Sequence, residues 1–232
     1  MIIHRPAHTR GNPFTDWITS FRTFSFAGYF NPKYRNFSHL RTINDDRVQP
    51  GGHVPEHEHK NMEIFGYVVE GVCRHTDSHG KILDIPAGAV QRMSTGSGIS
   101  HTEGNASDKP NRYMQLWIEP NVLEITPGYE QKTIPLEDKQ GKLCLVASPD
   151  GENHSVKIHA DAKIYAGLFN GNQSAILAIN PKLKAYVHLI KGSLNVNGNS
   201  LSTGDALLIE GETKIQIKDG GNAEVLVFEL TA

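Results

Sequence analysis

The stretch 51–71, GGHVPEHEHKNMEIFGYVVEG, carries two histidines one residue apart, His57 and His59, shortly before an apolar and aromatic run. Residues i and i+2 of a β-strand project to the same face, about 6.6 Å apart along the strand. If residues 57–59 are extended, both imidazoles therefore point to one side and offer two ligands for a metal ion. One such pair is a weak indication of a site, because single histidines are more often ordinary core or surface residues.

A second pair of the same spacing, His101-Thr102-Glu103, follows the stretch GKILDIPAGAVQRMSTGSGIS at 80–100. Facing Cβ atoms on neighbouring strands lie about 4.5–5.5 Å apart, so two such pairs can bring three imidazoles and one carboxylate together. These donors suit a divalent transition metal, and no Cys lies in either pair to favour copper(I) or a closed zinc site. The sequence therefore predicts a metal site formed by His57, His59, His101 and Glu103.

Glu63 competes with Glu103 for the role of carboxylate ligand. An uninterrupted strand from 57 to 63 gives Glu63 the same parity as His57 and His59. The tight H-x-E spacing of the second pair favours Glu103, and on spacing alone both carboxylates remain candidates.

Short apolar stretches separated by turn residues recur along the whole chain, which predicts an all-β barrel or sandwich. The expected strands are 64–69, 72–75, 81–85, 113–118, 143–147, 164–169, 174–179, 186–190, 194–196, 206–209, 214–217 and 225–230. Asn197-Gly198 is a strong signal for a type I′ hairpin, and Asp219-Gly220-Gly221 is a second expected tight turn.

The length of 232 residues fits one large β domain or two domains, and a weak internal duplication favours two. Both halves follow an order of apolar strand, Gly, strand, turn and strand. Pro120, Pro127, Gly128 and Pro135 mark a linker, so we expect domains at 1–130 and 131–232. The second half has no H-x-H or H-x-E pair, and nine of the twelve histidines lie at or before position 101.

Composition excludes several functional classes. The formal net charge is −2 and no two Lys or Arg residues are adjacent, so charge does not indicate a nucleic-acid or anionic-membrane surface. The sequence shows neither a secretory h-region nor an apolar stretch of about 20 residues, so we expect a soluble cytoplasmic protein. Cys73 and Cys144 have no CxxC partners and are expected to be free thiols in a reducing compartment.

The two pairs lie within a longer pattern that resembles the cupin superfamily. Its first motif, G-x5-H-x-H-x3,4-E followed by Gly, corresponds to Gly51, His57, His59, Glu63 and Gly71. Its second motif keeps Gly80, Pro86 and Gly88 but has its histidine displaced.

That displacement points to one branch of the cupins, and the chain resembles the pirin family over residues 2–130. The stretches that carry this resemblance are HEHKNME at 57–63, PAGAVQRMSTGSGISHTE at 86–103, FSF at 24–26 and LRTINDD at 40–46. The second half resembles a generic metal-free cupin barrel. The resemblance thus implies two jelly-roll cupin barrels in tandem, the first metal-binding and the second degenerate.

The pirin resemblance also implies the ligand set His57, His59, His101 and Glu103. It favours Glu103 over Glu63, which would then orient an imidazole or pair with Lys60 or Arg92. The expected cofactor is one divalent transition metal, with Fe(II) first and Ni, Mn, Co, Cu and Zn as alternatives, because the affinity order alone does not select iron. Four protein ligands leave about two positions of an octahedron for substrate or O₂.

The activity implied by the resemblance is that of a bacterial quercetin 2,3-dioxygenase. Glu103 would act as the base that takes the 3-hydroxyl proton of a flavonol, and the metal would bind the flavonolate. O₂ would then add across the oxygenated ring, which opens with loss of carbon monoxide. The expected partners are a flavonol or enediol-like small molecule and O₂, with no direct nucleic acid and no membrane.

Two other functions are weighed against the enzyme. One is a non-enzymatic metal or redox sensor that regulates a partner protein, in which a change of one charge at the metal biases a nearby loop. The other is a degenerate cupin with a structural metal. Met62, Met93, Gln115 and Trp117 flank the predicted ligand strands, and core packing is the expected role of the Met and Trp residues as well as of the aromatic stretch 23–30.

Overall fold

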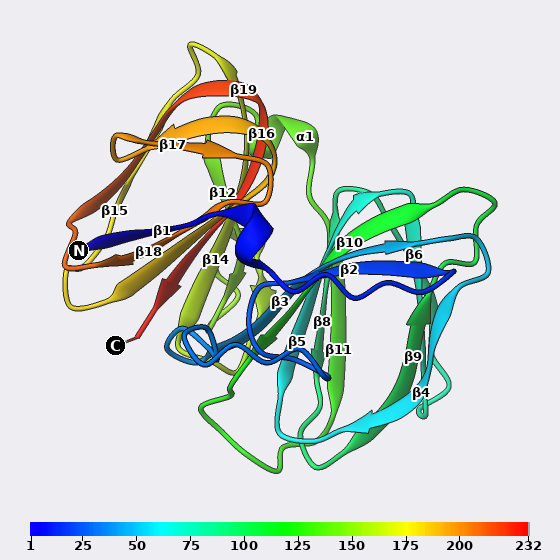
Figure 1. The fold of residues 1–232 in the computed structure, drawn as a ribbon. Helices are drawn as coiled ribbons and strands as arrows, with labels where there is room; N and C mark the ends of the chain where they lie inside the picture. Colours follow the sequence, from blue (N-terminus) through cyan, green and yellow to red (C-terminus); the bar gives the residue numbers. More distant parts are fainter. Residues whose placement is uncertain (232) are drawn as a thin grey trace. The chain divides into compact units, whose positions relative to one another are not determined.

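The computed structural model describes residues 1–231, which form two compact units (Figure 1). The N-terminal unit consists of Arg10–Thr133 and Val156–Ala160, and the C-terminal unit consists of Met1–Thr9, Ile134–Ser155 and the chain from Asp161 on. Each unit is therefore built from more than one stretch of the chain. The first nine residues join the C-terminal unit because strand β1 (Ile2–Arg5) pairs with β18 (Ala206–Glu210).

Two antiparallel sheets build the N-terminal unit. The larger has the strand order β11-β8-β5-β10-β3-β2 and the smaller β4-β9-β6-β7. Their strands are β2 (Ile18–Arg22), β3 (Leu40–Val48), β4 (His53–His59), β5 (Glu63–Glu70), β6 (Val72–Asp77), β7 (Ile82–Pro86), β8 (Ala89–Ser94), β9 (Ile99–Gly104), β10 (Asn111–Ile118) and β11 (Gly128–Thr133). Gln91 and Gln115 of the larger sheet donate hydrogen bonds to Glu103 of the smaller one, so the sheets face each other across a shared interior.

The interior of the N-terminal unit is apolar in one part and polar in another. Val48, Val68, Ile85 and Tyr113 belong to an apolar cluster that excludes water. Strand β5 is buried along almost its whole length, whereas β4 is half-exposed. The histidine-rich strand thus lies at the edge of its sheet (Figure 1), where its side chains can reach a ligand entering from solvent.

One large antiparallel sheet builds the C-terminal unit, in the order β1-β18-β16-β19-β14-β12, with β15 on β19 and β17 on β16. The further strands are β12 (Leu143–Ser148), β14 (Ala162–Gly171), β15 (Ala175–Ala178), β16 (Lys184–Val196), β17 (Asn199–Ser202) and β19 (Lys214–Leu230). Strand β13 (Val156–Lys157) belongs to the N-terminal unit. The all-β fold class predicted from the sequence is confirmed.

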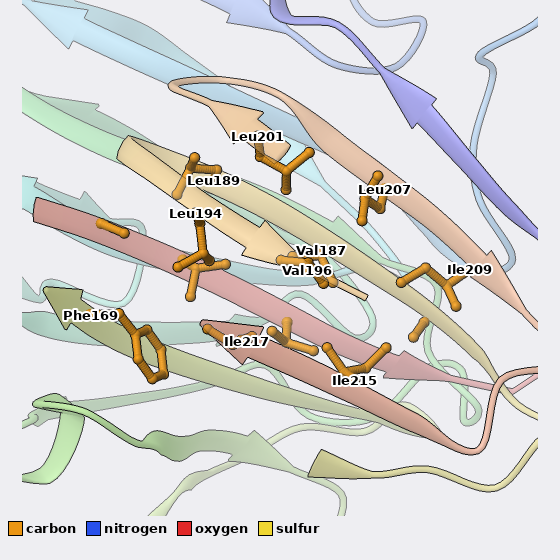
Figure 2. Close-up of a cluster of buried hydrophobic side chains, with 14 of the residues drawn as sticks. Phe169, Val187, Leu189, Leu194, Val196, Leu201, Leu207, Ile209, Ile215 and Ile217 are labelled. Atoms are coloured by element: carbon orange, nitrogen blue, oxygen red, sulfur yellow. The ribbon is translucent and has the colours of Figure 1, made fainter. Parts of the chain in front are cut away.

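The inside of the C-terminal unit is filled by hydrocarbon side chains. Figure 2 shows Leu189, Leu194, Ile215 and Ile217 packed together, and all four are almost fully buried. Within residues 1–231, both groups of three side chains able to hold a metal lie in the N-terminal unit. That the second barrel holds no metal stays a prediction.

Helical structure is confined to the short segments η1 (Ala7–Thr9), α1 (Leu136–Lys139) and η2 (Glu152–His154) within residues 1–231. No helix in this described part of the chain is long and apolar enough to be a membrane span. Cys73 and Cys144 are both free thiols, as predicted.

In the C-terminal unit, two pairs of stretches that were predicted as separate strands form single strands, so these two predictions are wrong. Stretches 186–190 and 194–196 form one strand, β16, and 214–217 and 225–230 form one strand, β19, so Asp219-Gly220-Gly221 is not a tight turn between separate strands. Register shifts along the β16–β19 pair absorb the glycines as bulges. The Asn197-Gly198 hairpin is confirmed, with φ of 48° and 82° at the two turn residues, as a type I′ turn requires.

Replacing Gly192 by alanine should reduce the free energy of unfolding by about 3 kcal/mol, from left-handed backbone strain and steric overlap. Gly192 has a φ of +83°, and an added Cβ would clash with the backbone oxygens of Gly221 and Asn222. Gly198→Ala is the matched control. Gly198 has a φ of +82° but nothing within 4 Å of a Cβ, so only about 1 kcal/mol is expected. Urea unfolding measures both, and equal losses would contradict the clash.

Candidate metal centre

Strands β4 and β9 pair antiparallel and set His57 directly opposite His101. The pairing has a bulge, because Val54 faces Glu103 and the next registered pair is His57 with His101. Pro55 lies in the bulge, where its lack of an N–H costs no ladder bond. Without the extra residue, Glu56 would face His101, and His57 would project to the other side of the sheet. The bulge therefore brings the three histidines to one face.

Three imidazoles gather at this point. The ring centroids of His57 and His59 lie 4.6 Å apart, those of His57 and His101 4.6 Å, and those of His59 and His101 5.0 Å. One ring nitrogen from each lies within 4.8 Å of the others. This arrangement brings together three of the four ligands predicted from the sequence.

The ring nitrogens of these histidines are available to bind a metal cation. The His57 Nδ1–H donates to the Pro55 carbonyl oxygen at 2.8 Å, which leaves the lone pair on Nε2. Within residues 1–231, His59 Nε2 and both ring nitrogens of His101 have no hydrogen-bond partner. Burial, together with the neighbouring imidazoles, lowers the pKa of His59 to about 4 and that of His101 to about 3. Neutral imidazoles with unused lone pairs are the form that binds a metal.

Glu103, the fourth predicted ligand, is buried beside His101. Its Oε1 lies 4.0 Å from His101 Nδ1, and it accepts hydrogen bonds from Gln91 Nε2 at 3.1 Å and from Gln115 Nε2. With His75 and His101 it forms a second group of potential ligands, whose donor atoms also lie within 4.8 Å of one another. His101 thus belongs to both groups. Glu103 lies next to the three-histidine group through its proximity to His101.

Glu63, the competitor, lies elsewhere. Its Oε2 accepts hydrogen bonds from Ser94 Oγ at 3.0 Å and from the His159 backbone N–H at 3.1 Å. Among residues 1–231 it belongs to neither group of potential metal ligands. Glu63 therefore ties strand β5 to the segment 156–160 of the same unit.

A cavity of about 400 Å³ opens beside the histidines. His57 and His59 line it, and the Trp117 ring meets His59 edge-on with centroids 4.7 Å apart. Phe26 packs edge-on against Trp117 at 4.9 Å, whereas Phe24 is fully buried. The aromatic stretch 23–30 thus contributes both to the core and to the pocket wall. Trp117 does the same: it packs against the buried cluster of Ile64, Met93 and Ile99, as expected, and it also lines the pocket. A cavity of this size, with aromatic and polar side chains on its walls, suits a drug-sized molecule.

The comparisons with known proteins agree with this geometry. Residues 4–118 match the Pirin family, and residues 145–230 match the quercetinase C-terminal cupin domain. The chain is 40% identical to a quercetin 2,3-dioxygenase of Escherichia coli over 231 residues, with 99% of each chain covered. The chain belongs to the pirin family. A further pirin-family relative, a Pirin-like protein of Caulobacter vibrioides, is 32% identical and covers 99% of each chain.

A solved structure extends the pirin comparison to a metal. The crystal structure of the bacterial pirin YhhW from Escherichia coli in complex with nickel(II) matches with a TM-score of 0.94. Identity is 39%, and the match covers 100% of this chain and 99% of that one. The predicted pirin resemblance and the two cupin-type domains are confirmed. The prediction of an oxidoreductase agrees with the names of the curated relatives.

Two groups of contacts near the site of this pirin-family chain were not predicted from the sequence. His75 Nε2 lies 3.2 Å from Asp77 Oδ2, and the His75 ring packs against His101 with centroids 5.4 Å apart. His75-x-Asp77 has the same i, i+2 spacing as the ligand pairs, so the spacing itself was the available signal. Gln91 and Gln115 hold Glu103 from the opposite sheet, a contact that no local pattern encodes.

Proposed function

We propose that the chain is a metal-dependent dioxygenase that opens the ring of a flavonol such as quercetin, with the ion held by His57, His59, His101 and Glu103. The observation that carries the proposal is the convergence of three imidazoles on one point at the edge of an aromatic-walled cavity. The names of the relatives that share its whole length support the substrate class.

The donor set supports a divalent transition metal. Three imidazole nitrogens and one carboxylate oxygen are the ligands that Fe, Ni, Mn, Co, Cu and Zn accept, and no thiolate lies among them. We propose Fe(II) as the native ion, with nickel(II) as its first competitor because the Escherichia coli pirin structure contains it. When bound, such an ion supplies a Lewis acid and a place for O₂ to meet the substrate.

Each side chain then has a distinct task. Glu103 accepts the proton of the flavonol 3-hydroxyl, and the amides of Gln91 and Gln115 fix the direction of its carboxylate. Trp117 and Phe26 form an aromatic wall that orients a planar ring system and excludes water from it. Positioning by these walls keeps the reacting hydroxyl beside the histidines.

The test is metal-dependent loss of quercetin absorbance under air, compared with the same mixture under nitrogen. Metal-free protein is loaded separately with Fe(II), Ni(II), Mn(II), Co(II), Cu(II) and Zn(II), and the metal content is measured by mass spectrometry. We expect oxygen-dependent consumption with at least one ion and none without metal. His53→Ala is the matched control for the ligand variant His57→Ala, because His53 lies on the same strand β4 but in neither ligand group.

The regulator hypothesis makes the opposite prediction in the same experiment. A protein that binds iron stoichiometrically yet consumes no flavonol with any ion would contradict the dioxygenase and favour a metal-dependent partner of another protein. Consumption of a simple enediol but not of quercetin would keep the reaction type and replace the substrate class.

A further inference from the structure

A ladder of polar side chains lines the cavity wall that faces the histidines. It consists of Ser20, Arg22, Asn44, Asp46 and Gln115, all of which border the cavity. The strand registers explain the row: Asp46 pairs with Ser20 across β2 and β3, and Asn44 pairs with Arg22 on one side and with Gln115 on the other. These residues belong to the six-stranded sheet, opposite the sheet that carries His57 and His59.

Within this ladder, Asp46 has no part in metal binding, in proton transfer or in the positioning of Glu103. Its side chain is almost fully buried, at 5% exposure, yet it borders the cavity. Ser20 hydrogen-bonds its carboxyl group, but Oδ1 has no hydrogen-bond partner within residues 1–231. A buried polar atom without a partner is costly, so its retention facing a cavity points to a ligand that completes it.

The neighbouring charges support the same conclusion. Burial and the nearby carboxylates of Asp45 and Glu103 raise the pKa of Asp46 to about 7, against the Ser20 hydrogen bond and the charge of Arg22. Near neutral pH the group is thus often an uncharged carboxylic acid, which can donate as well as accept a hydrogen bond. Arg22 Nη1 donates to the Phe26 carbonyl at 3.1 Å, while its Nε has no partner within residues 1–231.

We propose that Asp46 is a substrate-binding residue that hydrogen-bonds a second oxygen of the substrate, on the side turned toward the six-stranded sheet. This inference rests on the proposed function, because it takes the reacting hydroxyl to lie at the histidines. It narrows the substrate class to aromatic compounds that carry a further hydroxyl or carbonyl beyond the reacting pair. Asn44 and Arg22 belong to the same ladder and border the same cavity.

The test compares quercetin with 3-hydroxyflavone, which has the reacting hydroxyketone but no further hydroxyls. Binding to Ni(II)-loaded protein is titrated without oxygen, by the absorbance change of the flavonol. The variants are Asp46→Leu, which removes every hydrogen bond and keeps a branched side chain of similar outline, and Asp46→Asn, which keeps a donor and an acceptor. We expect Asp46→Leu to weaken quercetin binding by about tenfold or more and to leave 3-hydroxyflavone unchanged, with Asp46→Asn close to wild type.

A second readout separates binding from a structural role. If Oδ1 is held unpartnered for a ligand, Asp46→Leu should raise the melting temperature of the flavonol-free protein, because it removes the unpartnered buried atom, and Asp46→Asn should leave it close to wild type. Unchanged quercetin affinity in Asp46→Leu, an equal loss for both flavonols, or a lower melting temperature in both variants would overturn the inference. Wild-type binding without oxygen uptake would instead overturn the proposed activity and leave the variant comparison valid, and no wild-type binding would overturn both.

Discussion

Replacement of His101 by alanine is expected to remove the metal and to reduce flavonol consumption to that of the metal-free protein. His101 is the one side chain shared by both groups of potential ligands, and its ring is buried with both nitrogens unpartnered within residues 1–231. Without it, each group keeps only two donors. We expect metal affinity to fall by more than about 100-fold, beyond the range seen for loss of an outer partner of a ligand. Metal analysis of dialysed protein measures the loss.

Two further variants decide which group holds the ion. If the ion lies among the three imidazoles, His57→Ala loses the metal and His75→Ala retains most of it. The reverse pattern would place the ion with His75, His101 and Glu103 and would contradict the ligand set proposed above. His57 and His75 are both histidines packed against His101, so the pair controls for the loss of an aromatic neighbour.

The histidine pairs could be predicted because strand geometry is a local property. An i, i+2 spacing fixes a common face whatever the rest of the fold does, so His57 with His59 and His101 with Glu103 were readable from the sequence. The two pairs meet because of the bulge at Pro55. In a strand without it, His57 and His59 would project to the face opposite His101. Glu63 lies away from the site for another reason: strand β4 ends at His59, and a turn through Asn61, with a φ of 52°, leads into β5 of the other sheet.

The partners from the opposite sheet could not be predicted. Gln91 and Asp46 reach the site only because two sheets close over one another, and their positions in the sequence do not indicate this. Gln115 was expected to flank the ligand strands, but its hydrogen bond to Glu103 was not predicted. The long strands β16 and β19 were missed for a related reason. Glycines mark turns and bulges alike, and only the pairing of the neighbouring strand distinguishes the two.

Replacement of Glu103 by glutamine is expected to lower kcat for a flavonol by about 10²- to 10⁴-fold, the usual contribution of a positioned general base. An amide has the same shape but does not take up the hydroxyl proton. Gln91 and Gln115 both donate to the Glu103 carboxylate, so glutamine keeps one of these hydrogen bonds and stays close to its place. Stopped-flow absorbance with metal-loaded protein separates this step from binding.

Glu63→Gln is the matched control, because Glu63 is an equally buried carboxylate of the same unit. Both of its hydrogen bonds, from Ser94 and from His159, end on the single atom Oε2, so one amide oxygen can accept both. We expect this variant to keep wild-type kcat and metal content. Equal falls in the two variants would contradict a specific role for Glu103. A fall in kcat that only follows the metal content of Glu103→Gln would contradict the role of Glu103 as base and leave it only the role of ligand, because loss of a base slows turnover even at full metal occupancy.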